Sequence, residues 1–479
     1  SDGKLYAPAD VFVINARLAE GLERIFYTSG TYTVEVPPGR VVVEAHKGFE
    51  YLPAEQTLEA EAGASHAVTL TLQPIADLPA KGWFAATTHT HMNYGGPLRN
   101  TPAMLGLMAR AQGLHIVSAL VANKDNRVLD WQYFRPNGSV DPASDLPGRL
   151  MIVFGEEHRP AFWGHTFYIG LREHLISPFA SGYKGTALDS LYPSNTDLFR
   201  LARAQGAATG YVHAFGGDGD PLAGSLGGAK GLAIDVALRT TDALEWSAAS
   251  RGSLIPLFHA WNNDFHIAPV GGEDSLANME SQRLPGIIRT YAYLGANFTL
   301  EGWVGALKKG NVFLTSGPVV EFSVGGKMPG ESLTLPAAGG PVAIAGMVRS
   351  RTPVTSVRIY RDGTIWKEIQ PSGSREVRFD EQAAVTGSGW FNLVVEAEET
   401  RPAPGAYAQA VTNAVRVYAG KQPIRNRASA EYYLQWLKKL RSQVSDPAHY
   451  RSERERSAVL AGIDEAAAVY RKRMEDVQP

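Results

Sequence analysis

The chain has 479 residues, more than one ordinary hydrophobic core accommodates, so we expect roughly two to four domains. Lys and Arg number 46 against 48 Asp and Glu, and this balance, without a basic run, argues against nucleic acid as a partner. No stretch approaches the roughly 20 apolar residues of a membrane span. Cysteine is absent, which excludes disulfides and thiolate ligands, so any metal must be held by imidazole and carboxylate groups.

The sequence begins at Ser1 rather than at a methionine. Such a start is typical of a chain whose upstream segment, for example a signal peptide, has been removed. A cloning boundary gives the same appearance. We therefore expect a periplasmic or secreted protein, with a cytoplasmic one as the alternative.

The first segment, residues 1–80, has the pattern of a small all-β module. Apolar and polar residues alternate over 31–36, 40–45 and 66–72, and a Pro-Pro-Gly turn separates the first two runs. Several short strands with turns between them favour a β-sandwich.

The second segment, residues 81–305, alternates short apolar runs with helical stretches. The expected helices are 101–112 and 196–205, and the expected strands are 116–121, 150–154, 166–171, 208–213 and 243–246. This alternation predicts the α/β class, with a parallel sheet or a barrel. In such folds the functional site lies at the carboxyl ends of the strands.

Two further segments complete the chain. Residues 306–422 return to a strand pattern and predict a second β-sandwich. Residues 423–479 predict a helical tail, because apolar residues recur there at helical spacing. We expect these residues to pack against the main body; they are Tyr433, Trp436, Leu437, Leu440, Val444, Val459, Ile463, Ala467 and Tyr470.

The strongest functional signal is the pair His89 and His91, which follows the apolar run at 83–86. Side chains alternate along a strand, so both imidazoles point to the same side and can reach one metal ion. Four further candidate ligands stand at expected strand edges beside glycines, namely Glu157, His165, His213 and Asp274. Glu156 is the alternative to Glu157, because a shift of one residue exchanges them.

With these motifs in this order, the chain resembles the PHP superfamily of metal-dependent phosphoesterases, and more narrowly its CehA/McbA branch, which includes carbaryl hydrolase. The Thr-Ser-Gly-Pro segment at 315–318 and the helical tail belong to the resemblance. It implies a distorted (β/α)7 barrel for the central domain, flanked by the two sandwich modules.

The resemblance also implies a ligand set for one or two divalent ions, Zn, Mn or Fe. Its first metal would take His89, His91, Glu157 and Asp274. Its second would take His165 and His213, with Glu157 bridging the two ions.

The chain departs from the superfamily at a third metal site. No histidine stands between His91 and His115, and Ala122 and Leu276 occupy two positions where the superfamily has histidines. All three ligands are missing together. We therefore expect the third site to be absent and the other two to be retained.

These observations predict a metal-dependent hydrolase. Two metal ions can bridge a water, lower its pKa and polarise the scissile bond. Loss of the third ion removes an anchor for phosphate, which favours an ester, carbamate or amide bond. A PHP-type phosphoesterase is the first alternative. The second is a non-catalytic scaffold that binds carbohydrate or a cell-envelope partner. We expect a small-molecule substrate and leave the oligomeric state open.

Other polar residues have weaker assignments. Asn123 and Arg159 are candidates for substrate binding, since both follow expected strands. We expect a supporting or structural role for Asp235, Asp242 and Glu245, and loop positions for His158, His259 and His266. The Gly-Gly-Asp-Gly-Asp segment at 216–220 is expected to form a flexible loop over the site.

Overall fold

The structure is a computed structural model. It describes residues 3–9, 11, 13–18, 21–95, 98–186, 188–278, 281–399 and 407–475. None of the helices in these ranges is both long and apolar enough to cross a membrane. The expected periplasmic or secreted location stays a prediction.

The central part is built on parallel strands whose residues are almost all buried. β5 (Trp83–His91) pairs with β6 (Ile116–Lys124), and β6 pairs with β8 (Met151–His158). Both faces of this sheet are covered, which explains the continuous apolar runs in place of strict alternation. The carboxyl ends of these strands therefore meet at one edge.

The remaining central strands extend this sheet until it returns to β5. β9 (Thr166–Ile169) is antiparallel to both β8 and β10 (Ala208–Tyr211), and β11 (Ala243–Trp246) and β12 (Ala268–Gly271) continue in parallel. β13 (Ser275–Leu276) then pairs with the end of β5. The short β7 (Arg127–Leu129) pairs with β6.

The α/β class is confirmed, but the sheet is mixed rather than parallel throughout. It also extends beyond the central part: β15 (Arg289–Tyr293) joins β5 to β16 (Val312–Thr315), and β16 pairs with β24 (Ala408–Thr412). The distorted (β/α)7 barrel therefore stays a prediction, as do the expected domain boundaries.

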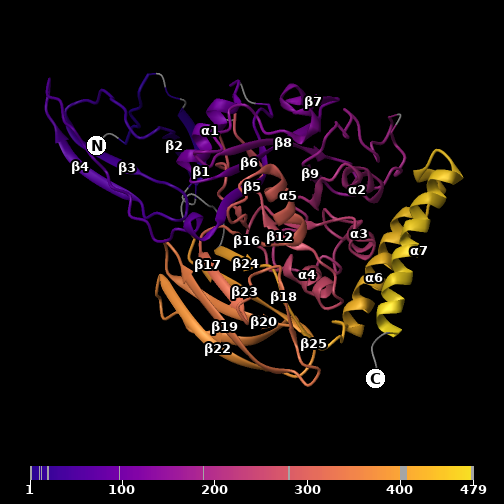
Figure 1. The fold of residues 1–479 in the computed structure, drawn as a ribbon. Helices are drawn as coiled ribbons and strands as arrows, with labels where there is room; N and C mark the ends of the chain where they lie inside the picture. The colour runs from indigo at the N-terminus through magenta and orange to yellow at the C-terminus, as the bar shows by residue number, and fades with distance from the viewer. Residues whose placement is uncertain are drawn as a thin grey trace.

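Helices cover this sheet (Figure 1). They are α1 (Pro102–Ala111), α2 (Asn195–Ala204), α3 (Leu232–Ala237), α4 (Leu254–Trp261) and α5 (Leu300–Lys309). The helices expected at 101–112 and 196–205 are confirmed as α1 and α2. Their starts follow from capping: the Thr101 hydroxyl accepts a hydrogen bond from Met104 N, and Ser194 and Asp197 form a capping box.

The N-terminal module forms only part of the expected strands. β3 (Gly39–Ala45) pairs with β4 (Ala54–Ala60), and β1 (Val13–Leu18) lies between β2 (Gly21–Phe26) and β14 (Ser281–Gln282). The strands expected at 31–36 and 66–72 are wrong, since both segments are without regular strand structure. Alternation in 66–72 does place every second side chain on the less exposed side, but no described strand pairs with this segment.

The C-terminal strands divide between two sheets. β17 (Val319–Val324), β19 (Gly340–Arg349) and β22 (Glu376–Val385) form one sheet. The strands joined to the central sheet are β18 (Ser332–Leu335), β20 (Val354–Arg361), β21 (Thr364–Ile369), β23 (Gly389–Ala397), β24 and β25 (Val415–Ala419). Apolar side chains of both sheets share one core, an arrangement in keeping with the expected sandwich.

The helical tail is a hairpin of α6 (Arg427–Val444) and α7 (Glu453–Glu475), drawn in yellow in Figure 1. It packs against α3 and α4. All nine apolar residues that we expected to face the body are buried. Short 3-10 helices lie at Pro79–Lys81, Trp131–Tyr133, Pro136–Gly138 and Pro447–His449.

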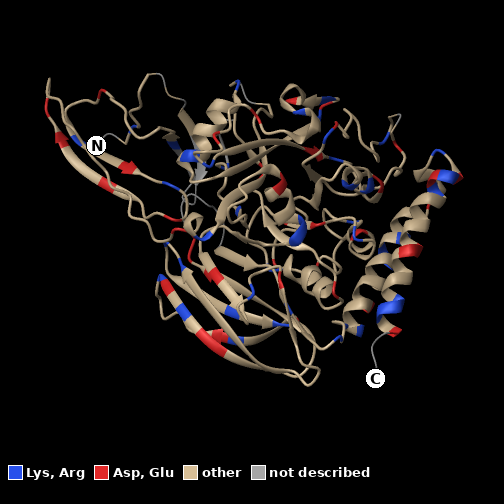
Figure 2. Cartoon of the chain, in the orientation of Figure 1, with Lys and Arg blue, Asp and Glu red and all other residues tan. Residues whose placement is uncertain are grey.

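Acidic and basic residues are interspersed along the ribbon, with both signs on the hairpin (Figure 2). The arrangement does not test which partners the protein binds. The expectation that nucleic acid is not among them stays a prediction.

Packing of the hairpin generates a stability prediction. Trp436 on α6 is fully buried, and its indole N–H donates to Lys230 O at 2.9 Å. Trp436→Ala leaves a cavity and should destabilise the protein by about 3–5 kcal/mol. Trp131→Ala is the matched control, because Trp131 is 62% exposed and its loss should cost about 0.5 kcal/mol or less. Equal shifts of the urea-unfolding midpoint would contradict this view of the hairpin.

Candidate metal centre

The two histidines at the end of β5 point into the same buried site. His89 Nδ1 lies 3.0 Å from Glu245 Oε1, and His91 Nδ1 lies 3.0 Å from Leu120 O. A carboxylate and a carbonyl only accept hydrogen bonds, so both Nδ1 atoms donate. In neutral rings the two Nε2 atoms, which lie only 3.1 Å apart, would then carry the lone pairs. Two lone pairs held this close fit a shared cation.

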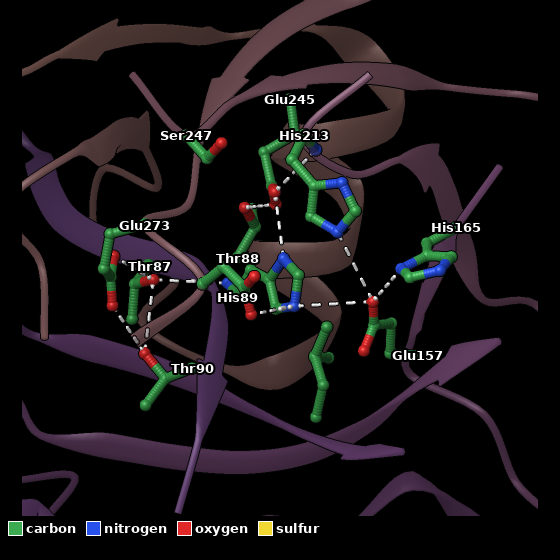
Figure 3. A network of polar contacts seen from close by, with 12 residues as sticks. Thr87, Thr88, His89, Thr90, Glu157, His165, His213, Glu245, Ser247 and Glu273 are labelled. Carbon is green, nitrogen blue, oxygen red and sulfur yellow. Dashed lines mark hydrogen bonds and ion pairs between the residues drawn. The ribbon is translucent and has the colours of Figure 1, made fainter. Parts of the chain in front are cut away.

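Glu157 on β8 brings together four imidazoles. Its Oε2 lies 3.2 Å from His91 Nε2, and its Oε1 lies 3.8 Å from His89 Nε2. The same Oε1 lies 3.0 Å from His165 Nδ1 and 3.6 Å from His213 Nε2. Figure 3 shows His89, His165 and His213 converging on this carboxylate.

Two groups of potential ligands therefore share one carboxylate. Ligand atoms of His89, His91 and Glu157 lie within 4.8 Å of one another, and so do those of Glu157, His165 and His213. Together these five residues make up both of the ligand sets expected from the sequence, except for Asp274. Imidazole and carboxylate donors in this arrangement suit divalent transition metals.

Asp274 lies beside the first group. Its Oδ1 is 3.3 Å from the Nε2 atoms of both His89 and His91. Its backbone N–H donates to His89 O, and its φ of 53° lies in the left-handed region. The backbone thus adopts an uncommon conformation where it presents this carboxylate, as residues at functional sites often do.

The second group is also shaped by unusual backbone. His213, just after β10, has a φ of 34°. Gly164 precedes His165 with a φ of 93°, and a Cβ at this position would lie 1.6 Å from Gly228 O. Only glycine fits there, so the Trp-Gly-His motif reflects a steric requirement beside a candidate ligand.

The choice between Glu156 and Glu157 follows from strand alternation. Glu156 points away from the histidine cluster, where its Oε1 contacts His174 Nδ1 and its Oε2 accepts from Leu175 N and Ile176 N. Glu157 points into the cluster. The geometry therefore favours Glu157 as the ligand.

Hydrogen bonds behind the histidines fix their orientation. Glu245 on β11 accepts from His89 Nδ1 and, at 2.6 Å, from the Thr88 hydroxyl. A carboxylate behind a metal-binding histidine holds its ring and tautomer. Glu245 therefore has the supporting role expected from the sequence.

Other supporting residues were not anticipated. Glu273 is fully buried and accepts from the hydroxyls of Thr87, Thr90 and Ser275, two of which appear with it in Figure 3. Arg283 Nη1 donates to Ser247 O and Glu273 O, which ties the end of β11 to the segment carrying Asp274. The threonines stand beside the His pair in the sequence, but no pattern there indicates their contacts with Glu273 or the position of Arg283.

The charges of the cluster depend on one another. Burial disfavours ionisation of Glu157, but contacts with His165, His213 and His91 hold its pKa well below its usual value. Burial likewise opposes charge on His89, yet Asp274, Glu245 and Glu157 raise its pKa to about 10. Glu157 is therefore ionised at neutral pH, and without a metal ion the compensating positive charge lies on imidazoles such as His89, where a bound cation would replace the proton.

The weaker assignments have mixed outcomes. His158 and His259 are not loop residues, since His158 is buried at the end of β8 and His259 lies in α4 against Tyr432. The loop at 216–220 is anchored rather than free over the site: Asp218 pairs with Arg251, and Asp220 accepts from Tyr432. The contact of Asp220 with Tyr432 joins the central part to the hairpin.

The remaining weak assignments agree with the expectations. Asp235 and Asp242 are buried in hydrogen-bond networks with Thr196 and Arg203, apart from the histidine cluster. His266 is exposed in a loop near Asp264.

The two substrate-binding candidates lie together near the cluster. Arg159 Nε is 3.5 Å from Glu157 Oε2, and the Arg159 backbone N–H donates to Asn123 Oδ1 at 2.9 Å. Asn123 is only 1% exposed, so the structure shows it supporting Arg159. Contact of either residue with substrate stays a prediction.

No family model and no curated protein matches this chain. Among solved structures, a two-domain protein from Bacteroides vulgatus, described as containing a predicted PHP-like metal-dependent phosphoesterase, is 11% identical; the match covers 70% of this chain and 94% of that one, with a TM-score of 0.34. A lesion-specific endonuclease from Pyrococcus furiosus is 16% identical over 47% of this chain and 56% of its own, with a TM-score of 0.31.

A third likeness is to fibronectin(III)-like modules of CbhA from Clostridium thermocellum, 20% identical over 21% of this chain and 96% of that one, with a TM-score of 0.15. At these scores the likenesses establish neither a family nor an activity. The interpretation of the site therefore depends on its own geometry.

The opposite orientations of two neighbouring glutamates generate a prediction. Glu157→Gln removes the shared carboxylate and should lower the metal content of the purified protein to the background of metal-free samples. Glu156→Gln is the matched control and should retain the metal, because Glu156 faces away from the histidines. Elemental analysis of both variants, with circular dichroism as a check of folding, measures this. Equal metal loss in both variants would exclude the assignment.

The support behind His89 generates a second prediction. Glu245→Gln keeps the size of the side chain but removes the charge that holds the His89 tautomer. Metal affinity should fall by about 10–100-fold, as for comparable supporting residues. Competition with a fluorescent chelator measures the dissociation constant. An unchanged value would show that Glu245 has only a packing role.

Proposed function

We propose that this protein is a metal-dependent hydrolase with a two-ion centre of the PHP type. The observation that carries the proposal is the shared carboxylate: Glu157 lies within ligand distance of four histidines from three separate segments of the chain. Packing alone does not require four imidazoles around one buried acid. A pair of divalent ions gives each of these groups a partner.

The donor set fits such ions. His89, His91 and Asp274 would hold one ion, His165 and His213 the other, and Glu157 both. Histidine and carboxylate donors without cysteine favour Zn, Mn or Fe. Glu157 Oε2 is buried and has no hydrogen-bond donor among the described residues, as a ligand oxygen would in the metal-free chain.

The residues around the centre would have separate roles in hydrolysis, namely holding the metal ions and orienting the ligands. Bound divalent ions lower the pKa of water and polarise a scissile bond. Glu245 and the Leu120 carbonyl accept hydrogen bonds from the Nδ1 atoms of His89 and His91, which leaves the Nε2 atoms directed at the centre. The buried β5 and β8 hold the ligands on rigid backbone, which keeps the site ready before substrate binds.

We further propose an ester, carbamate or amide as the substrate and membership of the CehA/McbA branch. Both proposals rest on the sequence motifs. Ala122 and Leu276, at positions where a third ion would need histidines, have no donor atoms in their side chains. A PHP-type phosphoesterase is the second candidate, since the same centre could attack phosphorus.

Metal removal tests the function. Chelator treatment should abolish hydrolysis of aryl esters or carbamates, and added Zn, Mn or Fe should restore it. His89→Ala should lose metal and at least about 1,000-fold in kcat/KM. His66→Ala is the matched control, because His66 is exposed in the N-terminal module. Steady-state kinetics with matched aryl acetates, carbamates and phosphates measures both variants.

Three outcomes would separate the alternatives. Hydrolysis of phosphoesters alone would overturn the proposed substrate class but keep the enzyme. A metal-free protein that is insensitive to chelators would favour the non-catalytic scaffold. Full activity of His89→Ala would exclude this site altogether.

A further inference from the structure

A cationic wall lies beside the candidate metal centre. It consists of Tyr94, Lys124 and Arg159. Tyr94 stands three residues beyond His91, Lys124 ends β6, and Arg159 follows the last residue of β8. Since β5, β6 and β8 are neighbouring parallel strands, these side chains come from adjacent strand ends, at the same edge as the centre.

The Tyr94 ring contacts both cations of the wall. Its centroid is 5.0 Å from that of His91, which places it against a candidate ligand. Lys124 Nζ lies 4.4 Å and Arg159 Cζ 5.4 Å from the same ring centre. Contacts of this kind hold cations by attraction to the ring face, and an arginine so stacked keeps its planar fork available for an anion.

The guanidinium of Arg159 has a hydrogen-bond donor that its neighbours do not fully satisfy. The Arg159 backbone is fixed by Asn123, and its guanidinium is 22% exposed. Its Nε is buried without a hydrogen-bond partner among the described residues, and the distance of 3.5 Å to Glu157 Oε2 is too long for a strong bond. A charged donor with only this long contact is incompletely satisfied, and a ligand oxygen that accepts from the guanidinium gains a charge-assisted hydrogen bond.

The charge of the wall is only partly balanced. Lys124 Nζ pairs at 3.0 Å with Asp125, whose side chain is 63% exposed, so this pair is screened by water. Glu157 is shared with the histidines. Two cations therefore lie beside a centre whose carboxylates also contact the histidines.

We propose that Arg159, held by Tyr94 and assisted by Lys124, binds an oxyanion of the substrate. The enzyme would then act on anionic rather than neutral compounds, either on esters and amides that carry a carboxylate or on phosphoesters. Asn123 is a positioning residue for Arg159. The proposal rests on the proposed hydrolase function, because the wall borders the same centre.

Matched substrates test the proposal. For the wild type, 4-nitrophenyl hydrogen succinate should be hydrolysed with a higher kcat/KM than neutral 4-nitrophenyl acetate. Arg159→Met should lower kcat/KM for the succinate about 100-fold, mainly through KM, and change the acetate by less than about 3-fold. Arg159→Lys should recover part of the loss. Arg172→Met is the control, because Arg172 is exposed beyond β9.

Equal losses on the neutral and the anionic ester would overturn the proposal, because they would show that Arg159 acts only through Glu157. Preference of the wild type for the neutral ester would overturn it too. Replacing the succinate with 4-nitrophenyl phosphate distinguishes carboxylate from phosphate as the source of the oxyanion.

Binding measurements separate this proposal from the function on which it rests. Calorimetry with inorganic phosphate and with succinate needs no turnover. Loss of anion binding in Arg159→Met, with unchanged metal content, supports the wall even where the tested esters are not hydrolysed. Equal anion binding by the wild type and Arg159→Met would contradict the proposed anion-binding role of Arg159 and leave the proposed metal centre unaffected.

Discussion

The site depends on a buried carboxylate placed among four imidazoles. Burial disfavours the negative charge of Glu157, and the surrounding histidines compensate for it. The histidines in turn are kept in place by groups that only accept hydrogen bonds, such as Glu245 and the Leu120 carbonyl. Each group is therefore stabilised by the others, and the Nε2 atoms of His89 and His91 and the Glu157 carboxylate are left directed at a common centre.

This constraint explains the local backbone around the centre. The ligands come from the ends of β5, β8 and β10 and from loops beside them, so the chain must turn sharply where each side chain is presented. His213 and Asp274 adopt positive φ, and Gly164 is in contact with Gly228. Such conformations cost free energy and persist because the packed sheet beneath them holds the backbone.

Much of the centre was predictable from sequence, because strand alternation and strand ends follow simple geometry. Alternation alone pairs His89 with His91, and it also separates Glu156 from Glu157 once one of them is known to face inward. Contacts between distant segments were not predictable. The position of Arg283 depends on how two loops pack, and no local pattern encodes that.

Prediction of the fold has the same limit, because contacts between distant segments cannot be read from local patterns. Helix starts with Thr or Ser caps were located to within a residue, and the apolar stripes of the tail face the body as expected. Alternation in the N-terminal module correctly predicted which side chains are less exposed, but a strand also needs a hydrogen-bonded neighbour. Whether residues 66–72 find one depends on tertiary structure, which periodicity does not report.

The pairing of β16 on both of its edges determines where the chain can be shortened. β16 joins β15 of the central part to β24 of the C-terminal strands, so the two parts share one hydrogen-bonded sheet. Cutting the chain before β16 would leave β15 as an open edge with unpaired amides and carbonyls, a surface on which strands of other molecules assemble. The two parts are therefore continuous through one sheet, and a fragment that ends before β16 would expose this edge to solvent.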